Sequence, residues 1–363
     1  MTPKHSLAAA LIVAGLACGL GTALYSGRCL AQSAPPTQPH ALDAATRTEV
    51  AIAIKANLDH TYVFPDKARA MDEALDASLA RGDFTAITDG DAFAKALTDL
   101  LQRTSHDGHL MVRYFPQAMP AGHGDRADQA REAAAELTQE RRFNFGLSTV
   151  QRLKGNIGYI DLHEFGRPQG AAPRIAAAMN LLAGTDALIV DLRHCGGGDP
   201  DTVMAFASYL YDKPTHLNDI YWRDENRTER RWTRAKVPGT RYGEARKVYL
   251  LTSPDTFSGC EDFAYALKNN HRATVIGQTT GGGAHAGSPH RLTAHFMMFV
   301  PSGRPINPVT HADWEGTGVA PDVQVSADKA MDVAQLAALK ALVANEHDPR
   351  WKAKLEQRVT ELH

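Results

Sequence analysis

The sequence predicts an α/β fold built on a parallel sheet, preceded by a smaller helical domain. Three observations carry this prediction. Strand-like apolar runs alternate with helical patterns between residues 156 and 276, glycine-containing turns follow three of those strands, and helical periodicity fills the segment before residue 115. Strands that alternate with helices pair in parallel through helical crossovers. The expected architecture is therefore a core sheet covered by helices.

Composition places the chain among ordinary globular proteins. Its 363 residues are enough for roughly two or three domains with their own cores. Apolar residues make up 44% and charged residues 22% of the chain. The formal net charge of -2 gives no electrostatic reason to expect nucleic acid as a partner.

Residues 1–32 are predicted to be a secretory signal peptide. A basic start precedes an apolar run over 7–24, and small residues come before a proline-rich linker at 33–42. A single membrane anchor or a lipid-modified Cys18 are the alternatives. We expect this segment to be removed, leaving an exported, periplasmic or secreted protein without a stable membrane span.

Two cysteines remain after the signal peptide, Cys195 and Cys260, and each lies beside a glycine-containing turn. One disulfide between them is an option, but two isolated cysteines do not make a disulfide framework. We therefore favour buried free thiols.

Residues 43–115 are predicted to form the helical N-terminal domain, with three or four helices. Helical patterns cover Thr46–Leu58, Ala68–Leu79 and Phe93–Leu101, and the strand-like run Met111–Phe115 closes the segment. The polar stretch that follows, 116–144, is expected to be a loop or linker.

Residues 145–328 are expected to form the α/β core, and 329–363 to form C-terminal helices. The predicted core strands are 156–163, 186–192, 247–251, 273–276 and an added strand at 293–300. The predicted helices are 171–182, 202–211, 262–268, 330–344 and the tail after 348.

Ser258 is the leading candidate nucleophile, because it lies where a strand passes into a helix. Its hydroxyl is exposed beyond the strand end, and the first helical amides point to the same place. The amides of Gly259 and of Gly197 or Gly198 could stabilise a developing oxyanion. A serine at such a turn is more commonly a helix cap, so the rest of the chain has to support this interpretation.

The candidate base is His109, which follows a tight turn at Asp107-Gly108 and precedes a strand. Most histidines in loops are simply solvated. If His109 titrates near the reference pKa of about 6.5, activity should fall below that pH.

Other cofactor signals are weak, and no cofactor is expected. Glycines 281–283 lack a following Lys-Ser or Lys-Thr pair, and the spacing for dinucleotide binding is absent. The histidines at 285, 290 and 295 recur every five residues, which does not place ligands on one face of a strand or helix. No metal site is predicted from them.

Five motifs in order resemble the catalytic core of the tail-specific and C-terminal-processing serine peptidases, a family that includes the tricorn core protease and the interphotoreceptor retinoid-binding protein repeats. They are DGHL (107–110), DLRHCGGG (191–198), TSPDTFSGCEDFAYALK (252–268), GQTTGGGAH (277–285) and EGTGVAPDV (315–323). The resemblance covers most of residues 45–325. It implies a core of ββα units of the crotonase and caseinolytic-protease class.

Two departures indicate the branch of this family. The processing proteases carry a lysine base after the second glycine-rich turn, whereas this chain reads Gly-Gly-Gly-Ala at 281–284. They also usually insert a PDZ domain, for which the segment between His109 and Asn156 is too short. Both departures favour the tricorn and retinoid-binding branch. In that branch the resemblance makes His109 the base and Glu315 the residue that completes a relay, directly or through a bridging group.

The expected function is therefore a serine peptidase that cuts peptides or unfolded chain ends, using Ser258, His109 and Glu315. Gln278 is a candidate supporting residue of the pocket. A non-catalytic module that binds an apolar ligand or a peptide, and an ester hydrolase with the same triad, are the alternatives. Domain closure that brings His109 to Ser258 could gate activity.

Overall fold

The computed structural model describes residues 42–119 and 126–362. The predicted signal peptide, and all but the last residue of the linker, lie outside this range. Among the described helices, none combines the length and apolar character needed to cross a membrane.

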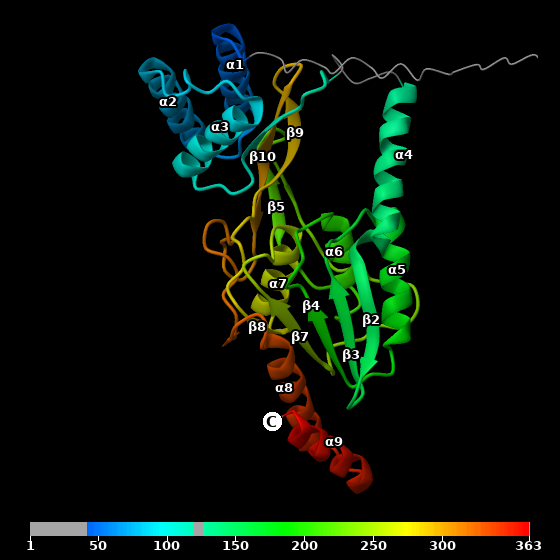
Figure 1. Cartoon of the computed structure of the whole chain (residues 1–363). Coiled ribbons are helices and arrows are strands. Elements are labelled where there is room, and N and C mark those ends of the chain that lie inside the picture. Colours follow the sequence, from blue (N-terminus) through cyan, green and yellow to red (C-terminus); the bar gives the residue numbers. More distant parts are fainter. Residues whose placement is uncertain (1–41, 120–125, 363) are drawn as a thin grey trace, which may run out of the picture. The chain divides into compact units, whose positions relative to one another are not determined.

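Three helices form the N-terminal layer where helical periodicity predicted them: α1 (Ala44–Thr61), α2 (Pro65–Arg81) and α3 (Gly90–Ser105). The Asp43 and Asp89 side chains accept hydrogen bonds from first-turn amides of α1 and α3, and a left-handed Gly82 ends α2. The core of this layer is shared with a later strand, because the buried faces of the helices pack against Phe296, Met298 and Val300. The helical segment therefore packs directly on the rest of the protein (Figure 1).

An antiparallel sheet lies next to these helices. Its strands pair in the order β1, β10, β5, β6, and β9 pairs with β10 as well. The bounds are β1 (Met111–Tyr114), β5 (Asp219–Trp222), β6 (Arg227–Glu229), β9 (Ala286–Arg291) and β10 (Phe296–Ile306). Only β1 and the start of β10 were predicted. This sheet joins the segment that carries His109 to the core, because β1 pairs with residues 296–299.

The predicted parallel sheet forms the second layer. Strands β3, β4, β7 and β8 run parallel to one another, as their alternation with helices indicated. Strand β2 adds antiparallel at one edge and β11 adds parallel at the other. The bounds are β2 (Leu147–Leu153), β3 (Ile157–Leu162), β4 (Ala187–Asp191), β7 (Lys247–Thr252), β8 (Thr274–Gly277) and β11 (Val323–Gln324).

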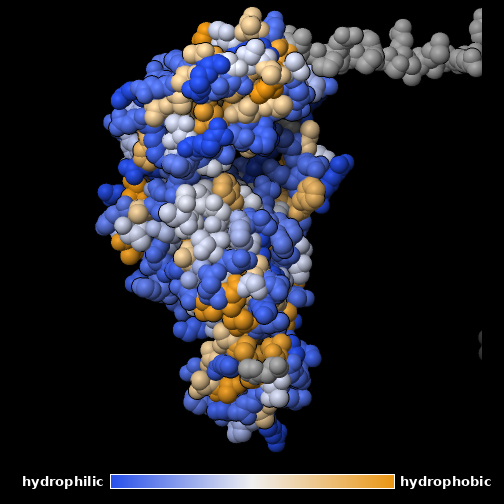
Figure 2. Space-filling view, turned by 60° about the vertical axis from the view of Figure 1, so that its left-hand side comes forward, coloured by the Kyte–Doolittle hydropathy of each residue, from blue (hydrophilic) through white to orange (hydrophobic). Residues whose placement is uncertain are grey.

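Both faces of the parallel sheet are covered by helices, which explains the continuous apolar character of its strands. In β4, Leu188 and Val190 belong to one core and Ile189 to the other. The first core contains α5 (Pro168–Leu181), α6 (Pro200–Ala207) and α7 (Gly259–Asn269); the second contains α8 (Ala330–Asn345) and α9 (Pro349–Glu361). Apolar side chains gather on the surface at the lower end of Figure 2, where Figure 1 places α8 and α9.

The expectation of a loop over 116–144 is wrong for α4 (Arg126–Arg142), and a short 3-10 turn, η1 (Asn144–Gly146), follows that helix. This segment is rich in alanine, glutamate, glutamine and arginine, which have high intrinsic helix propensity. It lacks the apolar periodicity on which the sequence argument relied. Arg167 at the start of α5 pairs with Glu136 and Glu140 of α4, both at 2.6 Å.

The parallel sheet positions three turns at one edge. The carboxyl ends of β4, β7 and β8 are followed by the turns at 192–199, 253–258 and 278–284. The carboxyl edge of a parallel sheet is where ligands bind in such folds. The candidate site is built from these three turns and from the 106–110 turn before β1.

Candidate active site

Ser258 occupies a strained backbone position at the start of α7. Its φ is 52° and its ψ is -121°, a backbone conformation that residues other than glycine rarely adopt. Ser253 Oγ donates to the Arg193 carbonyl and Thr256 Oγ1 to the Leu192 carbonyl, so the turn is bound to the end of β4. A sharp, strained turn between a strand and a helix directs a nucleophile away from the sheet.

His109 meets Ser258 in the structure, as predicted. Its Nε2 lies 3.1 Å from Ser258 Oγ, and its ring packs on that of Phe257 with 4.8 Å between centroids. Burial lowers the pKa of His109 to about 4, although the Asp107 carboxylate opposes the shift. The ring is therefore neutral at pH 7 and can accept the serine proton, and the expectation of titration near 6.5 is not met.

Asp107 fixes the turn that carries His109, a role that the sequence argument missed. Its Oδ1 accepts the His109 amide at 3.0 Å. Its Oδ2 accepts the Tyr62 hydroxyl at 3.0 Å and His285 Nδ1 at 2.6 Å. Burial would by itself lower the pKa of His285, but the hydrogen bond and charge of Asp107 raise it. Asp107 thus connects the helical layer, His109 and the core in one buried network.

Glu315 joins the turn that carries His109 to the third glycine turn, which is the turn at 278–284 after β8. It makes no hydrogen bond to His109 itself. Its Oε1 accepts the Gly108 amide at 3.1 Å, and its Oε2 accepts the amides of Ala284 at 2.5 Å and His285 at 3.2 Å. Burial and the nearby Asp107 charge raise the pKa of Glu315. Among the described residues, His109 Nδ1 is buried without a hydrogen-bond partner.

The predicted oxyanion glycines lie around Ser258 but differ in what their amides do. The Gly197 amide donates to Cys260 Sγ at 3.1 Å, whereas no described residue accepts from the amides of Gly198 and Gly259. The last two glycines touch, since a Cβ built on Gly259 would lie 3.2 Å from the Gly198 nitrogen. Gly197 packs on Ser258, because a Cβ built on Gly197 would come within 2.9 Å of Ser258 Cβ. The amides of Gly198 and Gly259 are therefore free to donate to another group, whereas that of Gly197 is not.

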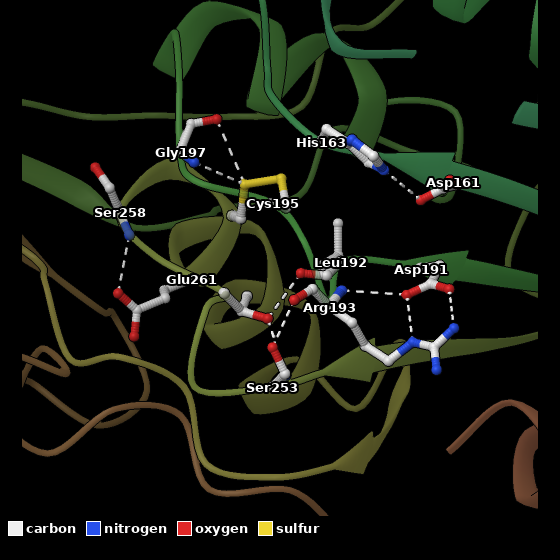
Figure 3. Close-up of a disulfide and its surroundings, with 12 residues drawn as sticks. Asp161, His163, Asp191, Leu192, Arg193, Cys195, Gly197, Ser253, Ser258 and Glu261 are labelled. Carbon is white, nitrogen blue, oxygen red and sulfur yellow. Dashed lines mark hydrogen bonds and ion pairs between the residues drawn. A yellow bond between two sulfur atoms is a disulfide. The ribbon is translucent and has the colours of Figure 1, made fainter. Parts of the chain in front are cut away.

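The preference for free thiols is wrong, because Cys195 and Cys260 form a disulfide (Figure 3). The two residues are 65 positions apart, and their Cα atoms lie 5.9 Å from each other. The sequence leaves the pairing open because proximity depends on how the β4 and β7 turns meet. The bond holds the glycine turn after β4 against the first turn of α7, and both segments surround Ser258.

Glu261 is a second residue that the sequence argument missed. Its side chain is fully buried and accepts hydrogen bonds from the amides of Ser258, Gly282 and Gly283 and from the Thr280 hydroxyl. Burial raises its pKa to about 6, although these donors favour the charged form. A capping-box pattern, Ser258 followed by Glu261, was the available signal. Glu261 thereby connects the nucleophile turn to the third glycine turn.

The other candidate residues do not contact Ser258 or His109. Gln278 accepts the Ala327 amide at 3.2 Å and makes no hydrogen bond to Ser258, so it supports the fold beside the site. Lys268, the lysine on the helix that follows Ser258, pairs with Asp322 at 3.3 Å. Within the described residues, His109 provides the one imidazole in hydrogen-bond contact with Ser258 Oγ.

Three side chains could hold a metal ion: one ligand atom from each of Asp107, His109 and Glu315 lies within 4.8 Å of the others. The carboxylate oxygens already accept hydrogen bonds from amides, a tyrosine or His285. This arrangement is typical of a hydrogen-bonded network. The histidines at 285, 290 and 295 do not converge, because His285 binds Asp107 and His290 contacts Ser288.

Comparison with known proteins finds two family models and several relatives that match this chain. A model described as "Peptidase family S41" matches residues 156–325, and one described as "N-terminal domain of Peptidase_S41 in eukaryotic IRBP" matches 42–144. A Staphylococcus epidermidis protein named "Probable CtpA-like serine protease" is 23% identical over 176 residues, which are 48% of this chain and 35% of that protein. The Arabidopsis thaliana "Carboxyl-terminal-processing peptidase 2, chloroplastic" is 28% identical over 176 residues, 46% of this chain and 31% of that protein.

The fold is also similar to that of a solved structure, "Structure of mature CPAF complexed with lactacystin". That similarity has a TM-score of 0.55 at 11% identity and covers 82% of this chain and 98% of the other. The chain spans about a third of the length of the two curated relatives. The family models together span the helical layer and the core that carries Ser258. The chain therefore belongs to peptidase family S41.

Proposed function

We propose that this chain is a serine peptidase in which Ser258 attacks a peptide carbonyl and His109 is the general base. The observation that carries the proposal is the 3.1 Å contact between Ser258 Oγ and His109 Nε2, two residues that are 149 positions apart. A serine hydroxyl becomes a useful nucleophile when a base lies within about 2.6–3.2 Å. A module that only binds a ligand would have no need of this contact.

The reaction proceeds through an acyl-enzyme. Ser258 Oγ bonds to the carbonyl carbon while its proton moves to His109 Nε2, and the oxyanion receives hydrogen bonds from the amides of Gly198 and Gly259. His109 then gives the proton to the leaving amine as the carbon–nitrogen bond breaks. A water molecule, deprotonated by the same imidazole, attacks the ester carbon, and the imidazolium returns the proton to Ser258 Oγ as the carbon–oxygen bond of the ester breaks.

Glu315 completes the relay through a bridging group. In the tautomer whose Nε2 accepts the serine proton, the buried Nδ1 already carries a hydrogen, and no described residue accepts from it. The Glu315 carboxylate belongs to the group of atoms within 4.8 Å that also includes a His109 nitrogen. A water molecule between them would accept from Nδ1–H and donate to the carboxylate. Glu315 thereby stabilises the charged imidazolium as well as the turn.

The substrates we propose are peptides and unfolded chain ends, and the compartment is outside the cytoplasm. The names of the relatives indicate proteolysis, and one indicates carboxyl-terminal processing. The disulfide beside Ser258 supports an oxidising compartment, because such bonds are rare in the cytosol. Export through the predicted signal peptide at 1–32 is consistent with an oxidising compartment outside the cytoplasm.

The test is hydrolysis of an unfolded protein and of internally quenched peptides. We expect turnover by the wild type and none above background by Ser258→Ala or His109→Ala. The matched control is His290→Ala, because His290 contacts Ser288 and lies outside the reacting pair. Turnover by His109→Ala near the wild-type rate would contradict the proposal, and hydrolysis restricted to esters would replace it with the esterase alternative.

A further inference from the structure

A small cavity lies beside Ser258 on the side of the oxyanion amides. Its volume is about 60 Å³, room for a side chain of a few heavy atoms. Gly198 and Gly259 line it together with Ser258, and Asp262 provides a carboxylate in its wall. The remaining wall includes the apolar residues Ile220, Ala284, Ala286, Pro305 and Trp314. The cavity is thus an apolar pocket with one acidic group.

Asp262 is only half paired. It lies one turn after Ser258 on α7, and its Oδ1 accepts from Asn218 Nδ2 at 2.5 Å. Asn218 is held in turn, because its own Oδ1 accepts from Asn307 Nδ2 at 2.7 Å. Within the described ranges, no group donates to Asp262 Oδ2. A hydrogen-bond acceptor that has no partner in an apolar pocket favours a ligand that brings a hydrogen-bond donor.

The charges around the pocket leave room for a cation. Arg231 attracts Asp262, but the two do not come within 4.0 Å, the ion-pair distance. The Arg231 guanidinium donates to the Pro200 carbonyl and lies 3.8 Å from Asp201 and 3.9 Å from Glu229. Burial raises the pKa of Asp262, while Arg231 and the Asn218 hydrogen bond oppose this. The local balance of these side chains is acidic.

We propose that this pocket binds the side chain of the substrate residue that contributes the scissile carbonyl, and that Asp262 selects lysine there. The inference rests on the proposed function, because it places the carbonyl carbon at Ser258 and the oxygen on Gly198 and Gly259, which line the same cavity. A helix rises 1.5 Å per residue, so Asp262 lies about 6 Å beyond Ser258 along α7. A four-carbon stem that ends in an ammonium spans such a distance while its methylenes contact the apolar walls.

The experiment compares two peptides that differ only at this position, lysine against its uncharged analogue norleucine. Cleavage sites are mapped by mass spectrometry and kcat/KM is measured for each peptide. We expect wild-type enzyme to favour lysine by about tenfold or more, and Asp262→Asn to reduce the ratio to about one. Asparagine keeps an oxygen for Asn218, so the fold should persist. The control Asp201→Asn removes a carboxylate near Arg231 that does not line the pocket, and should keep the ratio.

Equal cleavage of both peptides by the wild type, or an unchanged ratio in Asp262→Asn, would overturn the proposal. Failure of the proposed function gives a different result, because then neither peptide is cut. Two aminophosphonate esters that label Ser258 covalently are therefore tested as well, one with a lysine side chain and one with a norleucine side chain. Faster labelling by the lysine reagent, lost in Asp262→Asn, supports the pocket even without peptide turnover, and equal labelling contradicts it.

Discussion

The nucleophile turn and the base turn are held in place in different ways. Ser258 is fixed within the parallel-sheet core, by Glu261 three residues later and by the disulfide through Cys260, two residues later. His109 is fixed by Asp107 beside it, and by Glu315, which is more than two hundred residues away and bonds to the Gly108 amide. The core therefore organises the nucleophile by itself, whereas the base depends on how the helical layer packs against it. Changes on the two sides should have separable effects.

The largest expected effect is on the nucleophile. Ser258→Gly and Ser258→Ala should both abolish turnover, because no hydroxyl remains. They should differ in stability, since glycine adopts a φ of 52° without strain whereas alanine does not. We expect the glycine variant to be more stable than the alanine variant by about 1 kcal/mol in urea unfolding. Equal stability of the two variants would show that the turn is not strained.

The second largest effect is expected for Glu261→Gln. One of the two carboxylate oxygens becomes an NH2 group and then faces donors: the Ser258 and Gly283 amides on one side, or Thr280 and the Gly282 amide on the other. Loss of two such bonds should cost about 3 kcal/mol of unfolding free energy and lower kcat by about 100-fold through the oxyanion turn. Exposed Glu356→Gln is the control. A stable and active Glu261→Gln would refute this role.

Removal of the disulfide should affect the nucleophile side alone. The Cys195→Ala, Cys260→Ala double variant should lose about 2–4 kcal/mol of unfolding free energy. We expect kcat to fall by about tenfold with KM little changed, because the disulfide positions the oxyanion glycines, whose amides act on the transition state. Unchanged kcat in a folded double variant would mean that the disulfide serves stability only.

Glu315→Gln should have the smallest effect, on the base side. Glutamine keeps one oxygen, which can still accept the Ala284 and His285 amides while its NH2 group replaces the oxygen at the Gly108 amide, and it stabilises the His109 imidazolium less than a carboxylate does. We expect kcat to fall by about tenfold or less. The rate at which a small electrophile labels Ser258 should fall by the same factor as kcat, because labelling and turnover both need the His109 imidazole. An effect as large as that of His109→Ala would place Glu315 in direct contact with the base during the reaction.

The sequence predicts the parts of this molecule that local pattern determines. The parallel strands and their helices follow from apolar periodicity, and Ser258 follows from its place between a strand and a helix. The α4 helix was missed because its helicity rests on propensity without an apolar face. The antiparallel strands β5 and β9 are short and partly polar, and they form where β10 provides a partner.

The site residues that were missed share one property: their roles depend on contacts across long stretches of sequence. Asp107 and Tyr62 meet His285 only when the helical layer packs on the core. The pairing of Cys195 with Cys260 requires two turns to meet. The pKa of His109 reflects burial, which composition and spacing do not reveal.

The central claim is that His109 activates Ser258, and the most direct test is the rate at which a fluorophosphonate labels the chain as a function of pH. We predict that mass spectrometry finds the label on Ser258. Neutral His109 is the active form and its pKa is lowered to about 4, so wild-type labelling should stay constant from pH 8 to about 5 and fall as pH drops through 4. His109→Ala should be labelled at about one hundredth of the wild-type rate or below. A label on another residue, or His109→Ala labelled at the wild-type rate, would contradict the account.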